Sequence, residues 1–133
     1  MVLTSTYSKT QMQIETQYVK LRLQDGILFG QFATNIHMNL EIAKHCVETR
    51  INFIKHTPYP FVIDLRGIRS ISKEAREYMG KEGSQYVTAG ALLTNSFLAK
   101  TLGNFFLAIN APKVPSKLFD DEEKAIEWLK QFM

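Results

Sequence analysis

The sequence predicts a single α/β domain in which a mixed β-sheet of about five strands is covered by about four helices. Three observations predict this class: strand-like and helix-like segments alternate, a capping residue precedes each helix-like segment, and hydrophobic residues make up 45% of the composition. A chain of 133 residues can bury one core of its own. We therefore expect residues 1–133 to form one domain, with 1–15, rich in Ser, Thr and Gln, as a loosely ordered N-terminal extension.

An antiparallel hairpin is expected at the start of the domain. Apolar and polar residues alternate over 18–23, and 27–33 is a second strand-like segment. Between them lies Asp25-Gly26, a dipeptide that tolerates the positive φ angles of a type I′ turn. The turn therefore predicts that the two segments pair.

The first helix is expected to follow Asn39, which can cap it, and to end before Pro58. One apolar stripe recurs at steps of three and four residues: Leu40, Ala43, Val47, Ile51 and Ile54. The short apolar run at 61–63 then predicts a strand that is covered on both faces, and residues 64–67 lead away from it.

The second and third helices are also expected to begin at polar caps. The Ser72 hydroxyl can accept a hydrogen bond from an N–H group of the first turn. Residues 87–94 are strand-like, and either Asn95 or Ser96 can cap a third helix that extends to about residue 109.

The last two elements are a strand at 114–119 and a C-terminal helix. Pro115 cannot donate to a neighbouring strand, so this strand is expected at an edge of the sheet. Asp120 and Glu123 approximate a capping box for the helix that follows. Such alternation of strands and helices predicts a sheet with a parallel centre.

Composition excludes several classes of function. The formal charge is +3, but acidic and basic residues are interleaved without a basic stripe, so we expect no binding to nucleic acid. The most apolar stretch, 89–109, is interrupted by polar residues, so we expect no membrane span and a cytoplasmic protein. A single cysteine, Cys46, and three histidines predict no internal disulfide, no metal site and no cofactor.

No sequence motif of an enzyme is present. The chain lacks a Gly-x-Ser-x-Gly elbow, a Gly-x-x-x-x-Gly-Lys phosphate loop and a Gly-x-Gly-x-x-Gly fingerprint. Asp64 could act as a base, although a carboxylate at a strand end more often accepts N–H groups of the following loop. We therefore expect a protein that is not an enzyme.

Several segments resemble the STAS domains. The apolar strand at 61–65, the Arg66-Gly67-Ile68 that follows it and the helix that Ser72 opens are similar to the STAS core, and the similarity extends from Tyr18 onward. The segments Ser72-Lys73-Glu74-Ala75-Arg76 and Gly103-Asn104-Phe105-Phe106-Leu107 resemble those of bacterial proteins described as SpoIIAA-like or STAS/SEC14-related.

The resemblance implies a regulatory or protein-interaction module. In partner-switching STAS proteins a Ser at the start of the helix is phosphorylated, but Lys73 stands at that position here. Ser72 occupies the usual Asp position, and Ala75 the usual Gly position. The resemblance therefore implies a module that lacks this phosphorylation switch.

The carboxyl ends of the parallel strands are the expected binding region, because ligands of open α/β sheets bind there. Polar and cationic residues in or near these turns are Asp64, Arg66, Arg69, Ser72, Lys73, Asn95, Ser96 and Lys100. With helix N-termini nearby, they could hold a phosphate, a carboxylate or an acidic side chain of a partner. The alternative is that they are ordinary caps and solvated charges.

Large apolar residues occur around much of the third helix. Phe97, Leu102 and Phe106 could form a contact surface, in a dimer or around a lipid-like ligand, or could simply pack in the core. Two functions thus remain open: a STAS-type module for an unknown protein partner or a second copy of itself, and a carrier or sensor of a small anionic or lipid-like ligand.

Overall fold

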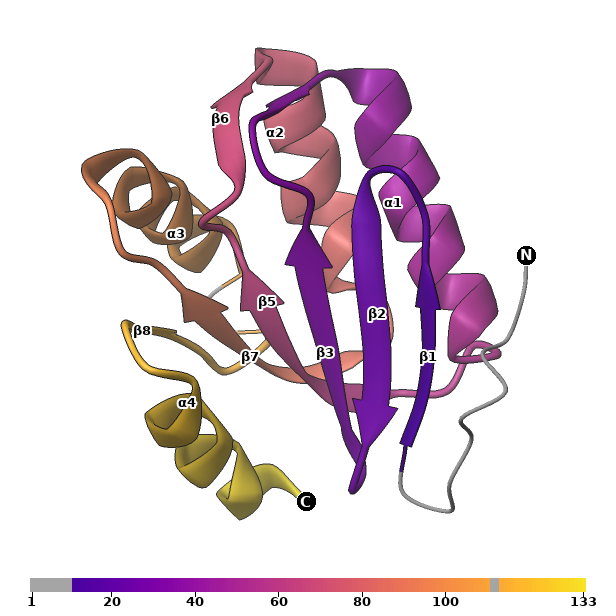
Figure 1. The fold of residues 1–133 in the computed structure, drawn as a ribbon. Helices are drawn as coiled ribbons and strands as arrows, with labels where there is room; N and C mark the ends of the chain where they lie inside the picture. The colour runs from indigo at the N-terminus through magenta and orange to yellow at the C-terminus, as the bar shows by residue number, and fades with distance from the viewer. Residues whose placement is uncertain (1–10, 111–112) are drawn as a thin grey trace.

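The computed structural model describes residues 11–110 and 113–133, which form a mixed six-stranded sheet with helices on both faces (Figure 1). Its strand order is β1-β2-β3-β5-β7-β8, and β4 and β6 pair separately as a parallel two-stranded ribbon. The predicted α/β class is confirmed. The elements are β1 (Gln11–Glu15), β2 (Val19–Gln24), β3 (Ile27–Phe32), β4 (Ile36–Met38), α1 (Leu40–Phe53), β5 (Tyr59–Asp64), β6 (Ile68–Ile71), α2 (Lys73–Lys81), η1 (Glu82–Ser84), β7 (Val87–Leu93), α3 (Phe97–Asn110), β8 (Ser116–Phe119), α4 (Glu122–Leu129) and η2 (Lys130–Phe132).

The predicted hairpin is confirmed. β2 and β3 are antiparallel, with Gln24 opposite Ile27. In the turn Asp25 has φ 53° and Gly26 has φ 80°. Both angles are positive, as a type I′ turn requires, and glycine takes such an angle without steric cost.

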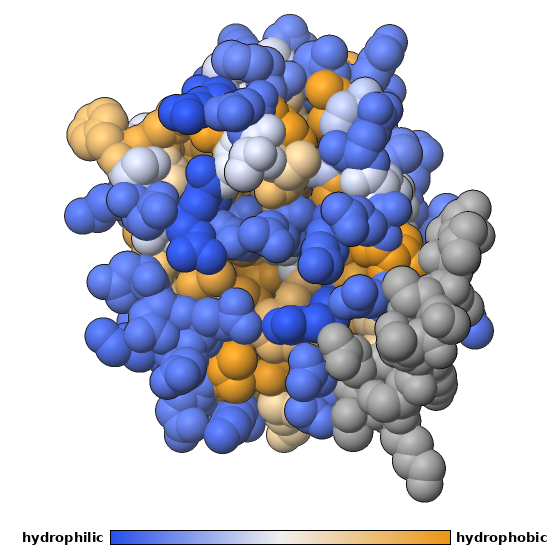
Figure 2. All heavy atoms as spheres, in the orientation of Figure 1, coloured by the Kyte–Doolittle hydropathy of each residue, from blue (hydrophilic) through white to orange (hydrophobic). Residues whose placement is uncertain are grey.

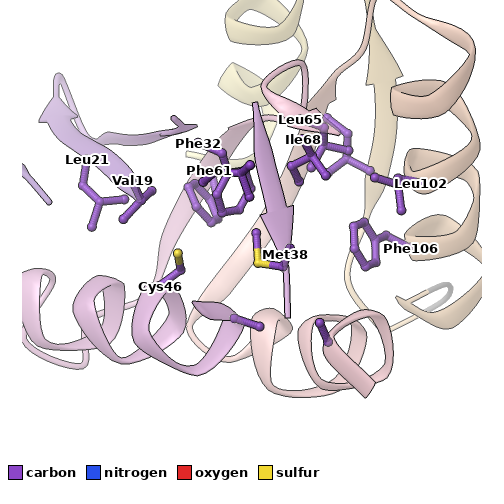
Figure 3. Close-up of a cluster of buried hydrophobic side chains, with 14 of the residues drawn as sticks. Val19, Leu21, Phe32, Met38, Cys46, Phe61, Leu65, Ile68, Leu102 and Phe106 are labelled. Carbon is purple, nitrogen blue, oxygen red and sulfur yellow. The ribbon is translucent and has the colours of Figure 1, made fainter. Parts of the chain in front are cut away.

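Alternate residues of the sheet pack into two apolar clusters on opposite faces. The larger cluster joins Val19 and Leu21 to side chains of α1, α2 and α3, and Figure 3 shows part of it. The smaller cluster joins Val62 and its neighbours to Ala125 and Leu129 of α4. Three helices therefore cover one face, and α4 covers part of the other (Figure 1).

The strands β3, β5, β7 and β8 are mutually parallel, so their carboxyl ends lie at one edge of the sheet. The β4–β6 ribbon follows β3 and β5 beyond this edge. Gly67 lies in the loop between β5 and β6, where a Cβ atom would come within 2.5 Å of the carbonyl oxygen of Ala33. Glycine lets the two segments approach this closely and so fixes the path of the loop.

The prediction of a loosely ordered extension over 1–15 is wrong for its last residues. Residues 11–15 form the edge strand β1, in which Ile14 lies opposite Leu21 and is 4% exposed. Residues 1–10 lie outside the described part of the chain. With β1, β4 and β6 the described residues contain eight strands, more than the five or so that were predicted.

The helix caps were largely predicted from sequence. Asn39 caps α1 by accepting a hydrogen bond from the Ile42 N–H at 2.9 Å. The predicted cap of the last helix is wrong by one residue, because α4 begins at Glu122 and Asp121 accepts from the N–H of Glu123 at 2.7 Å. Asp120 lies one residue too early for that role.

Candidate partner-binding site

Asp64, at the end of β5, is held by the loop that follows it. Its carboxylate accepts hydrogen bonds from the backbone N–H of Arg66 at 3.0 Å and from the Nε and Nη2 atoms of that side chain at 2.9 and 2.8 Å. Asp64 is buried, and the hydrogen bond between the two side chains raises the pKa of Arg66. Each charge therefore compensates the other, and Arg66 occupies both carboxylate oxygens of Asp64.

This pair lies on the face of the sheet that α4 partly covers. It shares a hollow of about 150 Å³ with Arg22 and Glu122, which form a second ion pair at 3.3 Å. Because both ion pairs are partly open to water, their contribution to stability is small.

Arg69 lies in β6 of the β4–β6 ribbon, and Ser72 and Lys73 follow that strand. The Arg69 Nε donates to the side-chain oxygen of Asn35 at 2.7 Å. The Ser72 hydroxyl accepts from the Ala75 N–H at 3.1 Å, which confirms Ser72 as the cap of α2. Lys73 is the first residue of α2 and is exposed. These residues line neither the Asp64 hollow nor the hollow described next.

A wider hollow, here called the α3 hollow, lies where β7 and β8 lead into α3 and α4. Its volume is about 480 Å³. It brings together four of the predicted residues: Asn95, Ser96, Phe97 and Lys100. Its lining consists of Thr94, Asn95, Ser96, Phe97, Lys100, Lys117, Leu118, Phe119 and Asp120.

The α3 hollow is mildly positive. Lys100 and Lys117 line it and are exposed, whereas the lining contains one carboxylate, that of Asp120. The Ser96 hydroxyl accepts from the Ala99 N–H at 3.2 Å, which identifies Ser96, not Asn95, as the cap of α3. The positive end of the helix dipole adds to the two lysine charges.

Phe97 projects from the rim of the α3 hollow into solvent. It is 89% exposed, and Leu98 beside it is 36% exposed. In Figure 2 an apolar group stands out from the surface at the position of α3 in Figure 1. Of the two alternatives left open for Phe97, packing in the core is therefore wrong, because the buried stripe of α3 passes through Ala99, Leu102 and Phe106 instead.

The other two residues of the predicted apolar contact surface do not lie on the surface. Leu102 is 3% exposed and Phe106 is 7% exposed, so both belong to the core. Of the three residues predicted for that surface, Phe97 alone is available to a partner. The predicted site residues thus divide into three groups: Asp64 and Arg66; Arg69, Ser72 and Lys73; and Asn95, Ser96 and Lys100 with Phe97.

Sequence reasoning missed Lys117, which lines the α3 hollow from β8. Its exposed position alternates with half-buried Ser116 and Leu118, a signal that was readable in the sequence. What the sequence could not supply was the strand order, which places β8 next to β7 and so brings Lys117 near the start of α3.

Within residues 11–110 and 113–133, no three His, Cys, Asp or Glu side chains gather as a metal-binding group. In the same part of the chain no helix combines the length and apolar character needed to cross a membrane.

Comparisons with known proteins identify a family and a fold. The family model DUF7793, described as a domain of unknown function, matches residues 21–133. No curated protein matches the chain. Among solved structures, the chain is similar to an uncharacterized protein of the DUF3478 family with a SpoIIAA-like fold from Shewanella loihica PV-4. The TM-score is 0.62 at 12% identity, over 94% of this chain and 99% of that one. This likeness concerns the fold alone, and it confirms the SpoIIAA-like fold that the sequence resemblance implied.

Proposed function

This chain belongs to the DUF7793 family of domains of unknown function and has a SpoIIAA-like fold, and from this premise we propose that it is a non-enzymatic regulatory module of STAS type. It acts as a single domain that binds a protein partner at the α3 hollow. The observation that supports this most is Phe97, which is 89% exposed at the rim of that hollow.

A binding role is favoured over catalysis by the state of the strand-end groups. Asp64, which could have served as a base, is already hydrogen-bonded by Arg66. Lys73 stands where partner-switching STAS proteins carry their phosphorylated Ser. Regulation by this module therefore depends on binding itself, without phosphorylation at that position.

The proposed partner combines an apolar side chain with acidic ones. Phe97 offers a large apolar contact area, and buried aromatic anchors carry much of the energy of protein interfaces. Lys100 and Lys117 lie beside it in the α3 hollow and would attract carboxylates of the partner. A cytoplasmic setting fits a chain with a single cysteine.

Site-specific photo-crosslinking in the native host tests this proposal. A photoreactive phenylalanine analogue is introduced at Phe97 and, as the matched control, at Tyr86. Tyr86 is also an exposed aromatic residue but lies at the other end of β7. We expect a defined adduct with one partner protein from position 97 and none with that protein from position 86.

Equal crosslinking from both positions, or from neither, would contradict the proposal. An adduct with a second copy of the chain would show that the protein forms a homodimer, and the α3 hollow would still be the binding surface. Size-exclusion chromatography with light scattering distinguishes this result from a partner of different sequence.

A further inference from the structure

A third concave feature lies inside the domain, between the sheet and helices α1 and α3. This cavity, here called the Arg50 cavity, has a volume of about 70 Å³. Most of its wall is apolar and includes Val47, Phe61, Leu92 and Phe106. Figure 3 shows Cys46, another lining residue, pointing from α1 toward the sheet.

Among the described residues that line this wall, Arg50 is the charged one. The residue lies on α1 and is 3% exposed. Its Nη1 donates to the carbonyl oxygen of Gln85 at 2.8 Å, and its Nη2 donates to that of Gly83 at 3.1 Å. The guanidinium carbon lies 5.3 Å from the centre of the Phe61 ring. Two of its five N–H groups thus have carbonyl partners, and the carbonyls are neutral.

No carboxylate of the protein compensates this charge. All 13 Asp and Glu residues belong to the described part of the chain, and the ion pairs there are Arg22–Glu122, Asp64–Arg66 and Glu127–Lys130. Burial lowers the pKa of Arg50 to about 10, so the guanidinium is still charged at neutral pH. A buried charge without a counter-ion is unfavourable, and proteins normally pair such groups.

The surroundings of Arg50 indicate which kind of anion would compensate its charge. One positive charge is neutralised by one negative charge, so a monoanion fits better than a phosphate dianion, which would leave a net charge in an apolar wall. The planar guanidinium matches the geometry of a carboxylate. The apolar walls favour an apolar tail on the same molecule, and the small volume favours a short one.

We propose that the Arg50 cavity is a binding site for a small amphiphilic carboxylate, with its anionic group on Arg50 and its apolar tail among Val47, Phe61 and Phe106. This site is separate from the α3 hollow, since no described residue lines both. A negative result for one of the two proposed sites therefore does not count against the other.

Calorimetric titration of the purified chain with hexanoate and with 1-hexanol tests the proposal. The variants are Arg50→Met, which keeps a long side chain without the charge, and Arg76→Met as the matched control. Arg76 lies on α2 with its guanidinium 4.9 Å from the centre of the Phe105 ring, and it does not line the cavity.

We expect saturable binding of hexanoate to the wild type and to Arg76→Met, and at least roughly tenfold weaker binding to Arg50→Met, because a charge-assisted hydrogen bond is lost. Hexanol should bind the wild type about tenfold more weakly than hexanoate, and Arg50→Met should leave its affinity unchanged. Butanoate, octanoate and decanoate then define the length of the tail.

Two results would overturn the proposal: no saturable binding of any acid from butanoate to decanoate, or equal affinity for hexanoate in wild type and folded Arg50→Met. If Arg50→Met does not fold, a second measurement on the wild type replaces the titration of this variant. It compares how strongly hexanoate and hexanol protect the Cys46 thiol from chemical modification. Hexanoate should slow the reaction of Cys46 with methyl methanethiosulfonate at least about tenfold more than hexanol does. Equal protection by both compounds would contradict the role of Arg50.

Discussion

The α3 hollow and the Arg50 cavity both combine aromatic side chains with cations, but water reaches them very differently. Lys100 and Lys117 are hydrated, so their charges cost little and carry little information about function on their own. Arg50 is removed from water without a carboxylate partner, which is unfavourable unless something compensates it. For the aromatic residues, exposure to water is the unfavourable state. Buried Phe106 is explained by packing alone, whereas exposed Phe97 is not. In each region the proposed function rests on the group that lies in the unfavourable environment.

The largest expected contrast between the two regions is in thiol reactivity. Burial raises the pKa of Cys46 from 9.0 to about 12. Since the thiolate is the reactive form, Cys46 should react with iodoacetamide at pH 8 roughly a thousandfold more slowly than a cysteine introduced by Lys100→Cys in a Cys46→Ala background. Mass spectrometry of timed samples measures both rates. Comparable rates would show that the Arg50 cavity is open to water.

The same pKa shift predicts a dependence of stability on pH. The folded state favours the protonated thiol of Cys46. The contribution of this thiol to the free energy of unfolding is therefore fully present below pH 9.0 and is lost as the pH rises toward about 12. Urea unfolding of wild type and Cys46→Ala between pH 8 and 11 checks this. The difference in unfolding free energy between the two proteins should shrink as pH rises, and a constant difference would contradict the buried thiol.

The second contrast concerns stability. Arg50→Met removes an uncompensated charge, but it also leaves the buried carbonyl groups of Gln85 and Gly83 without their donors. We expect the second effect to be larger, so that the free energy of unfolding falls by about 2 kcal/mol. Lys100→Met should change it by less than about 0.5 kcal/mol, since Lys100 is exposed. Urea unfolding followed by circular dichroism measures both. Equal changes in the free energy of unfolding would contradict the claim that the buried Arg50 and the exposed Lys100 differ in their contribution to stability.

The smallest contrast lies within the strand-end turns. Ser72→Ala and Ser96→Ala should each cost about 1 kcal/mol of stability through loss of a helix cap. Asn95→Ala should be nearly neutral, because Asn95 is exposed and does not cap α3. Ser72→Asp should also be nearly neutral, since Asp caps helices as well as Ser does. Thermal unfolding of the four variants tests this. A Ser72→Asp variant that is stable but no longer binds the partner would assign position 72 to regulation.

The sequence was most informative where local chemistry decides the structure. The Asp25-Gly26 turn and the caps Asn39 and Ser72 each act within a few residues, so the sequence identified them correctly. It failed over 11–15, where polar composition outweighed the alternation that places Ile14 in the core. Composition describes a segment on average, whereas burial on one face of a strand depends on every second residue.

The candidate site was predictable only in part, because a site depends on which elements become neighbours. The sequence indicated the strand ends, and Asn95, Ser96 and Lys100 do meet in one hollow. It could not indicate that the arginine after β5 would bind back to Asp64. Arg50 gave no signal at all, since a cation on an amphipathic helix is normally solvated.

The helical pattern of α3 alone did not decide whether Phe97 is buried or exposed. α3 carries apolar residues around much of its surface, so several stripes were consistent with the sequence. Packing on the sheet selects the one that contains Ala99 and Leu102 and leaves Phe97 outside. Tertiary contacts, which the pattern of one helix does not contain, decide which face is buried.

The most direct test of the proposed function is the affinity of the partner that crosslinks at position 97. Its dissociation constant is measured for wild type, Phe97→Ala and the double variant Lys100→Glu/Lys117→Glu, at low and high salt, with unfolding midpoints as the control for folding. The proposal predicts at least about thirtyfold weaker binding for Phe97→Ala. It also predicts about tenfold weaker binding for the double variant, with a reduced dependence on salt. Unchanged affinity in a folded Phe97→Ala variant would contradict the α3 hollow as the partner-binding surface.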